Sequence, residues 1–224
     1  MEYLTPPFID IHTHNKLNTP PGILQVRNLI VGQDEITIGN LYTAGIHPWH
    51  VDQSPNIQLK HLEVIAAKKE IIGIGECGLD KLSVTDWNLQ IEVFQQQIAL
   101  ANTINKPIII HSVRAYHEII QQLTLQRAQT PVIFHGFNKK KELAWELLKK
   151  GYYLSLGADI LFGGQNALIS TIPLNRIFLE TDNKTTNIVD IFSYFCAARK
   201  IPLAALKQQM VKNLEHVFNY RIKE

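Results

Sequence analysis

The sequence has few cysteines and no long apolar segment. Its two cysteines, Cys77 and Cys196, in 224 residues are too few for a disulfide framework and are typical of a reducing compartment. No apolar run approaches the ~20 residues that a membrane-spanning helix needs. The first residues lack the basic and then apolar regions of a signal peptide. We therefore expect a cytoplasmic protein with no membrane segment.

Strong charge and several familiar motifs are also missing. The formal net charge is only +2, which argues against a nucleic-acid coat protein and requires any anionic substrate to be held locally. The sequence has no G-x-S-x-G elbow and no Walker A loop, so it lacks the signatures of two common enzyme classes. It also has no internal repeat and no low-complexity tract. We expect a single domain over residues 1–224.

Apolar strand-like runs alternate with amphipathic stretches along the chain. The expected strands lie near residues 8–12, 24–31, 41–46, 71–75, 107–111, 131–135, 152–156 and 177–181. The expected helices lie near residues 57–69, 86–104, 114–126, 139–149, 188–198 and 203–219. This alternation predicts a parallel sheet, and its eight strands predict an α/β fold of the (β/α)8 TIM barrel type.

The beginning of the chain fits an ideal barrel less well. Residues 13–23 and 32–40 are short and rich in Pro, Gly and Asn, so they cannot form the full helices that normally separate barrel strands. We therefore expect the barrel to be trimmed or distorted around its first two to three strands.

Asp10, His12 and His14 lie at and just beyond the end of the first expected strand. Side chains two residues apart on a strand share one face, so both imidazoles could bind one metal ion. Later strand-like runs end in further acids and imidazoles. These are Glu76, His111, His135 and Asp182.

These polar residues all fall where a barrel carries its active site, at the carboxyl ends of the strands. Four imidazoles and two carboxylates form a mixed nitrogen and oxygen donor set, which suits Zn²⁺, Mn²⁺ or a similar ion better than Ca²⁺. Six ligands exceed the need of one tetrahedral ion, and a carboxylate such as Glu76 can bridge two. A structural role explains any single histidine about as well, but it does not explain the set.

Residues 73–78, Gly-Ile-Gly-Glu-Cys-Gly, match the dinucleotide fingerprint G-x-G-x-x-G. That fingerprint requires a helix to open at its last glycine, whereas residues 79–85 intervene here before any helical pattern. The carboxylate of Glu76 would also repel a pyrophosphate. We expect the glycines to let the backbone present Glu76, and Cys77 to be a small buried residue, not a nucleophile.

Other polar residues have two readings. His47 follows the third expected strand and is a candidate substrate contact, whereas a packing role explains His50 about as well. The run Lys139–Lys141 could attract a phosphate backbone, although a solvated helix start explains it nearly as well. Histidines on expected helices are assigned to solvent or packing. These are His61, His117 and His216.

Six segments carry these strand-end motifs in a definite order. They are residues 8–14, 45–48, 73–80, 107–112, 132–137 and 172–182. In order and approximate spacing they resemble the successive motifs of TatD-type metal-dependent deoxyribonucleases, over most of the chain. The resemblance implies a (β/α)8 barrel related to the amidohydrolases. It also implies metal-dependent hydrolysis of phosphodiester bonds, usually in DNA.

The resemblance further implies two divalent ions, Zn²⁺, Mg²⁺ or Mn²⁺, as cofactors. The implied ligands are His12, His14, Glu76, His111, His135 and Asp182. Glu76 and Asp182 would be catalytic, the first as a bridge and the second also handling the proton of water. Two ions about 3.5–4 Å apart can clamp an in-line displacement. Asp10 would lie behind the ligands and orient an imidazole or a backbone group.

Departures from the family pattern fall at substrate-contacting positions. Val113 stands where the family usually has arginine, which leaves Arg114, one position later, as a candidate substrate contact beside His47. Gly136 replaces a common cysteine, and residues 183–187 replace a longer basic loop. We expect a monomer acting on DNA or another phosphodiester. The alternatives are an amidohydrolase-like enzyme for a small amide, ester or lactone, and a metal-binding scaffold without catalysis.

Overall fold

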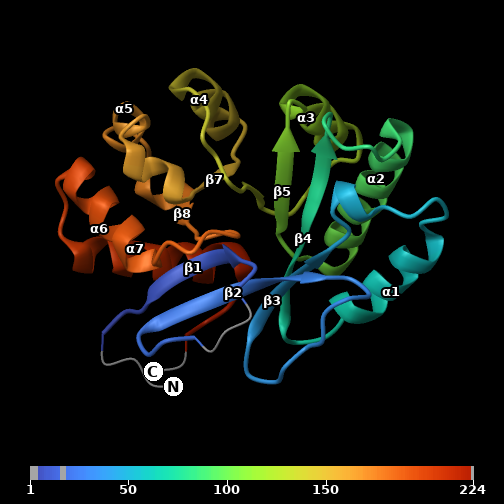
Figure 1. Cartoon of the computed structure of the whole chain (residues 1–224), viewed down its shortest axis with the longest axis horizontal. Coiled ribbons are helices and arrows are strands. Elements are labelled where there is room, and N and C mark those ends of the chain that lie inside the picture. Colours follow the sequence, from blue (N-terminus) through green and yellow to red (C-terminus); the bar gives the residue numbers. More distant parts are fainter. Residues whose placement is uncertain (1–4, 16–18, 223–224) are drawn as a thin grey trace. The chain divides into compact units, whose positions relative to one another are not determined.

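A computed structural model describes residues 5–15 and 19–222. The chain forms two compact units, the first from residues 1–27 and 134–224 and the second from residues 28–133. We call them unit 1 and unit 2. Figure 1 labels their helices and strands. The strands follow one another in the sheet in chain order, from β1 to β8.

The strands are β1 (Phe8–Thr13), β2 (Ile23–Ile30), β3 (Leu41–Gly45), β4 (Ile71–Asp80), β5 (Ile108–Val113), β6 (Val132–Phe134), β7 (Tyr153–Leu156) and β8 (Ile177–Leu179). The α-helices are α1 (Asn56–Ala66), α2 (Trp87–Ile104), α3 (Tyr116–Leu125), α4 (Lys141–Lys149), α5 (Asn166–Ile169), α6 (Ile188–Arg199) and α7 (Leu203–Phe218). Short 3-10 segments are η1 (Pro48–His50), η2 (Ala158–Phe162) and η3 (Leu174–Arg176).

Unit 2 is built on the parallel pairs β3 with β4 and β4 with β5. In this unit α2 and α3 lie beside β4 and β5 (Figure 1). Helix α2 begins where Asp86 accepts hydrogen bonds from two backbone N–H groups, and it ends at Asn105 in a left-handed conformation. Its Phe94 and Ile98 are fully buried, because residues spaced by three or four positions lie on one helix face.

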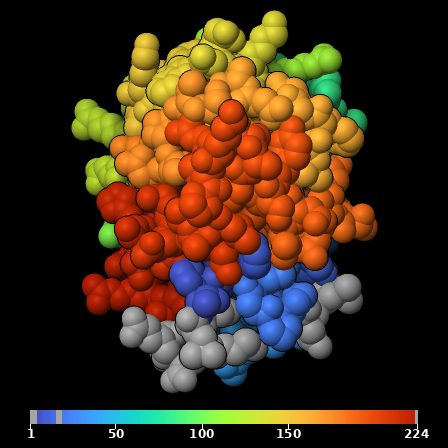
Figure 2. Space-filling view, turned by 90° about the vertical axis from the view of Figure 1, so that its left-hand side faces the viewer, coloured from blue at the N-terminus to red at the C-terminus, as the bar shows by residue number. Residues whose placement is uncertain are grey.

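Unit 1 joins β7 to β8 in parallel and packs α6 and α7 against β1 and β8. Asn187 caps α6 by accepting a hydrogen bond from the backbone N–H of Val189. The ring of Phe192 meets the ring of Phe8 edge-on, with 5.2 Å between centroids. Orange and red side chains from the last part of the chain cover much of the face in Figure 2. Phe192 is fully buried, and its contact with the ring of Phe8 stabilises the packing of α6 against β1.

The alternation of strands and helices predicted from the sequence is confirmed, with boundaries that differ by a few residues. No helix is described in the parts of residues 14–22 and 31–40 that the structure covers, which agrees with the expected trimming. One boundary was wrong, because β4 continues to Asp80 and encloses Glu76. The glycines of residues 73–78 resemble a strand end in sequence, but every residue of β4 is buried. The single domain stays a prediction.

None of the described helices is both long and apolar enough to cross a bilayer.

Gly78 is predicted to be essential for folding because β4 and β5 approach closely there. Its φ is +144°, and a Cβ atom would lie 2.1 Å from the carbonyl oxygen of His111. We expect Gly78→Ala to lower the free energy of unfolding by at least about 4 kcal/mol, or to prevent folding. The measurement is urea unfolding followed by circular dichroism.

Gly32→Ala is the matched control for this prediction. Gly32 also has a positive φ, +86°, but a Cβ atom added there would meet nothing within 4 Å. The loss should therefore be limited to the backbone strain of about 1–2 kcal/mol. Equal losses in the two variants would contradict the close approach.

Candidate functional site

Unit 1 contains a group of metal-ligating side chains that we call the His12 cluster. Nitrogen or oxygen atoms of His12, His135 and Asp182 all lie within 4.8 Å of one another. Oδ1 of Asp182 is 3.8 Å from Nε2 of His12 and 3.5 Å from Nε2 of His14. The rings of His12 and His135 are 4.4 Å apart at their centroids. Four predicted ligands therefore lie together in this unit.

Backbone hydrogen bonds bring Asp182 to the end of β1. The N–H of Asp182 donates to the carbonyl of His12 at 2.9 Å, and the N–H of His14 donates to the carbonyl of Asp182 at 3.0 Å. Asp182 has a positive φ of 53°, a conformation that aspartate tolerates better than most residues. These bonds place the Asp182 carboxylate beside both imidazoles of the His-x-His motif.

Asp10 lies behind this cluster, fully buried in β1. Its carboxylate accepts hydrogen bonds from the backbone N–H of Thr181 at 2.9 Å and from the Thr181 hydroxyl at 2.7 Å. Burial raises the pKa of Asp10 to about 7. Asp10 thus holds the segment that leads into Asp182 through the backbone and side chain of Thr181.

Glu180 is a buried acid that sequence reasoning did not assign to the site. Its Oε1 accepts a hydrogen bond from the N–H of Gly136 at 2.6 Å and lies 3.4 Å from Nδ1 of His135. Burial opposes ionisation of Glu180, but the hydrogen bond with His135 and the electrostatic interactions with His135 and His12 outweigh burial and lower the pKa of Glu180. Such a carboxylate orients an imidazole ring. Its spacing of two from Asp182 was the available signal.

Unit 2 contains a second group, the Glu76 cluster. Ligand atoms of His47, Glu76 and His111 all lie within 4.8 Å of one another. Oε1 of Glu76 is 3.2 Å from Nε2 of His47 and 2.8 Å from Nδ1 of His111. Burial lowers the pKa of His47, which favours the neutral imidazole. His47, expected as a substrate contact, therefore lies among potential metal ligands.

The strands of unit 2 position this cluster through close backbone contacts. A Cβ atom on Gly45 would lie 2.7 Å from the Cα of Gly75, so only glycine allows β3 to approach β4 this closely. The N–H of Glu76 donates to Oδ1 of Asn28 at 2.8 Å. The side chain of Gln97 bonds both backbone groups of Ile46, at 2.7 and 3.1 Å. These contacts hold the backbone on either side of the cluster.

Asp80 and Trp49 complete the surroundings of His111, and sequence reasoning assigned neither. Oδ2 of Asp80 accepts a hydrogen bond from Nε1 of Trp49 at 2.6 Å and lies 3.3 Å from Nε2 of His111. Although burial opposes ionisation, the hydrogen bond from Trp49 helps to lower the pKa of Asp80. Asp80 stands four residues after Glu76 in the same strand, which was the signal for a shared face.

The remaining sequence assignments fall outside the two clusters. Arg114 is exposed directly after β5, with a φ of +54°. Cys77 is fully buried in β4, where burial raises the pKa of its thiol, so it is a packed residue. Residues 73–78 lie inside β4, and α2 begins only at Trp87. No helix N-terminus therefore meets the last glycine, as a dinucleotide site requires.

The chemistry of both clusters fits a divalent metal ion. Each presents two imidazoles and one carboxylate, a mixed donor set used for Zn²⁺, Mn²⁺ and related ions. The buried carboxylates of Asp80 and Glu180 lie against the imidazoles of His111 and His135, an arrangement that is common behind metal-bound imidazoles. The fold and these donors define the class as metal-dependent hydrolases.

The chain belongs to the TatD related DNase family, whose model matches residues 32–219. It is 25% identical over 219 residues to the uncharacterized metal-dependent hydrolase YcfH of Escherichia coli, covering 90% of this chain and 80% of that protein. It is 32% identical over 172 residues to the uncharacterized metal-dependent hydrolase YabD of Bacillus subtilis, covering 70% of this chain and 68% of that protein. These relatives agree with the class that the donor clusters define.

A solved structure also resembles the chain. The crystal structure of YjjV, a TatD homolog from Escherichia coli, matches with a TM-score of 0.83 at 21% identity, covering 95% of this chain and 98% of that one. This likeness, together with eight strands in chain order, confirms the predicted (β/α)8 TIM barrel.

Metal content should depend on both clusters. We expect Asp182→Ala and Glu76→Ala each to lower the metal bound per chain by about one ion. Mutation of a residue that only hydrogen-bonds to a metal ligand typically lowers metal affinity about 10–100-fold, and loss of a ligand itself should lower it at least as much. The measurement is inductively coupled plasma mass spectrometry after dialysis. Glu215→Ala, an exposed acid on α7, should retain the wild-type content. Unchanged content in both cluster variants would contradict the ligand assignment.

Proposed function

We propose that this protein is a divalent-metal-dependent phosphodiesterase that cleaves DNA, acting as a cytoplasmic monomer. The observation that carries the proposal is the pair of donor clusters, each with two imidazoles and one carboxylate. Membership of the TatD related DNase family supports DNA as the substrate. The proposed ligands are His12, His14, Glu76, His111, His135 and Asp182.

The proposed chemistry is attack of water on phosphorus. Divalent ions in such sites supply Lewis acidity toward phosphoryl oxygens and lower the pKa of a coordinated water. Asp182 would accept the proton of the attacking water, since its carboxylate is held beside His12 and His14. The bond between phosphorus and the leaving oxygen breaks, and solvent protonates that oxygen.

Buried carboxylates would keep the reacting groups in place. Asp10 fixes the backbone of Thr181, the residue before Asp182, and Glu180 lies against the ring of His135. In the Glu76 cluster Asp80 lies against His111. Because positioning contributes much of the rate in phosphoryl transfer, each of these acids is proposed to orient a ligand or its backbone. Arg114 and His47 remain proposed substrate contacts.

An exposed aromatic ring favours nucleic acid over a small amide. Trp49 is 59% exposed, yet its indole N–H is held by Asp80 and its ring centroid lies 5.9 Å from that of His111. A fixed, exposed indole next to a proposed ligand offers a stacking surface for a nucleobase, and such stacking contributes about 1–3 kcal/mol per base. An amide, ester or lactone remains the alternative substrate, since the same donors could polarise a carbonyl.

Cleavage of single-stranded DNA is the first test of this function. After metal stripping, activity should return on addition of Mg²⁺, Mn²⁺ or Zn²⁺, assayed with a labelled oligonucleotide. Glu76→Ala and His14→Ala should lower the rate by more than about 100-fold, because each removes a proposed ligand, while circular dichroism stays unchanged. Glu215→Ala is the control.

Three results would count against the proposed nuclease activity. Retained activity in both ligand variants would contradict the proposed metal ligands. If the protein bound metal but no added ion restored DNA cleavage, the metal site would be supported and DNA would not be the substrate. A screen of bis-p-nitrophenyl phosphate beside amides, esters and lactones would then identify the reaction. Tight DNA binding without cleavage of any substrate would indicate the non-catalytic scaffold.

Trp49→Ala should weaken substrate binding specifically where a base is present. We expect KM for single-stranded DNA to rise about tenfold, as loss of one stacked base predicts. For an oligonucleotide with abasic sites around the cleaved bond, KM should stay nearly the same in the variant and the wild type. Trp49→Phe, which keeps an aromatic ring at this position, should retain most of the affinity for single-stranded DNA. An equal rise for both substrates would instead mean that Trp49 only supports Asp80.

A further inference from the structure

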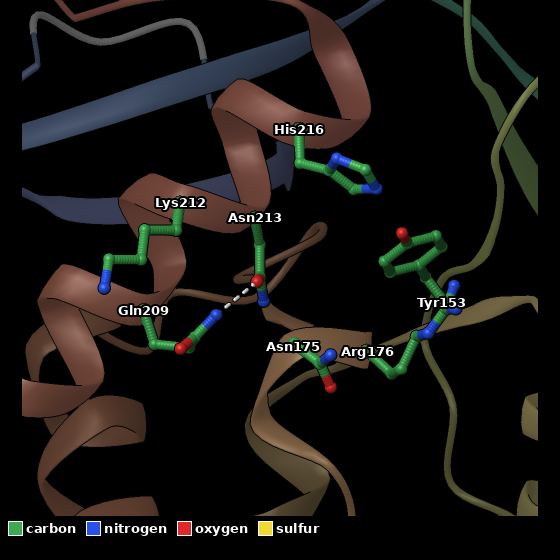
Figure 3. A pocket seen from close by; sticks show the side chains of 7 residues that line it. All are labelled: Tyr153, Asn175, Arg176, Gln209, Lys212, Asn213 and His216. Carbon is green, nitrogen blue, oxygen red and sulfur yellow. Dashed lines mark hydrogen bonds between the residues drawn. The ribbon is translucent and has the colours of Figure 1, made fainter.

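A cavity of about 260 Å³ lies in unit 1, away from the His12 cluster. Its lining residues come from β7, η3 and α7 and are Tyr153, Asn175, Arg176, Gln209, Lys212, Asn213 and His216 (Figure 3). Tyr153 begins β7, and η3 immediately precedes β8. The cavity therefore lies at the amino ends of these strands, whereas Asp182 follows the carboxyl end of β8.

The lining is basic. Arg176 and Lys212 carry positive charge, His216 adds an imidazole, and none of the lining residues is acidic. Lys212 and His216 are four residues apart on α7, so they share one helix face. A set of basic side chains without an acid among them favours an anion in the cavity.

Arg176 is held in place rather than freely solvated. Its Nη1 donates a hydrogen bond to the carbonyl oxygen of Gly151 at 3.0 Å. Its guanidinium carbon lies 4.9 Å from the ring centroid of Tyr153, a stacking geometry that leaves the other N–H donors available. An arginine fixed in this way loses little side-chain entropy when it binds an anion.

Tyr153 presents its hydroxyl group to the same space. The residue is only 4% exposed, and its hydroxyl points into the space between α7 and η3 (Figure 3). Within the described part of the chain no hydrogen bond to this hydroxyl is formed. A tyrosine hydroxyl can donate and accept a hydrogen bond, so this one is available to a ligand in the cavity.

The wall of the cavity is fixed by Asn213, which is buried on α7. Its Nδ2 donates to the carbonyl oxygens of Leu174 and Ile177, both at 2.8 Å. Its Oδ1 accepts a hydrogen bond from Nε2 of Gln209 at 2.8 Å, drawn as a dashed line in Figure 3. These bonds tie α7 to η3 and β8, so the cavity is a built feature of the unit.

We propose that this cavity binds the phosphate group of a small phosphorylated molecule, at a site distinct from the His12 cluster. A phosphate monoester carries close to two negative charges and accepts several hydrogen bonds, which matches two cationic side chains, an imidazole, amide groups and a hydroxyl. Small-molecule pockets usually measure about 300–1,000 Å³. This smaller cavity therefore fits one phosphate with a short attached group. The proposal does not depend on the nuclease activity.

The test is isothermal titration calorimetry of the full-length metal-loaded protein with glycerol 3-phosphate. Lys212→Glu should lower the affinity at least about tenfold, because it replaces a cation by an anion at the site. Tyr153→Phe should lower it about threefold or more, as loss of one hydrogen bond predicts. Lys149→Glu makes the same charge change on an exposed residue of α4 outside the lining, and it should bind as the wild type does.

Inorganic phosphate should compete with glycerol 3-phosphate, whereas glycerol should not. Phosphate bound only at metal ions would be insensitive to Lys212→Glu and Tyr153→Phe, and that result would overturn the proposal. So would the absence of saturable binding. A third arm uses a short single-stranded oligonucleotide. If Lys212→Glu weakened its binding while glycerol 3-phosphate did not bind, the cavity would be a nucleic-acid contact instead.

Discussion

The His12 cluster depends on the two backbone hydrogen bonds between Asp182 and the end of β1. They run from Asp182 to His12 and from His14 back to Asp182. Through them residues far apart in sequence meet at short range, and the positive φ of Asp182 turns its carboxylate toward both imidazoles. Asp10 secures the same junction by binding Thr181. A carboxylate buried in this way is costly without partners, so the acids and the backbone of this region support one another.

In unit 2 the corresponding constraint is the close approach of strands at glycine. Gly45 and Gly78 stand where a side chain would collide with neighbouring backbone atoms. Because these glycines have no Cβ atom, β3, β4 and β5 can lie close enough to bring His47, Glu76 and His111 within contact distance. The G-x-G-x-x-G pattern is therefore a consequence of strand packing. It serves the presentation of Glu76 and not the binding of a dinucleotide.

The two ends of the strands in unit 1 carry different chemistry. Histidines and acids follow the carboxyl ends, as in other barrels, where the loops form active sites. Cations and amides from η3 and α7 line the cavity at the amino ends of β7 and β8. A metal site collects acids and neutral imidazoles, and a phosphate site collects positive charge. The side chains at each end of the strands in unit 1 therefore match the ligand that is proposed there.

The alternating elements, the fold class and the set of candidate ligands could be predicted from the sequence, because helical and strand periodicity and residue type are local properties. It misplaced the end of β4, since glycines read locally as a strand end while burial in the sheet continued the strand to Asp80. The three-dimensional packing shows further that His47 lies against Glu76. It also places Asp80 and Glu180 against histidines of the two clusters, and it brings His216 to a cavity that Arg176 also lines. These relations join residues distant in the chain, and the packing of whole elements, not any local pattern, sets which of them meet.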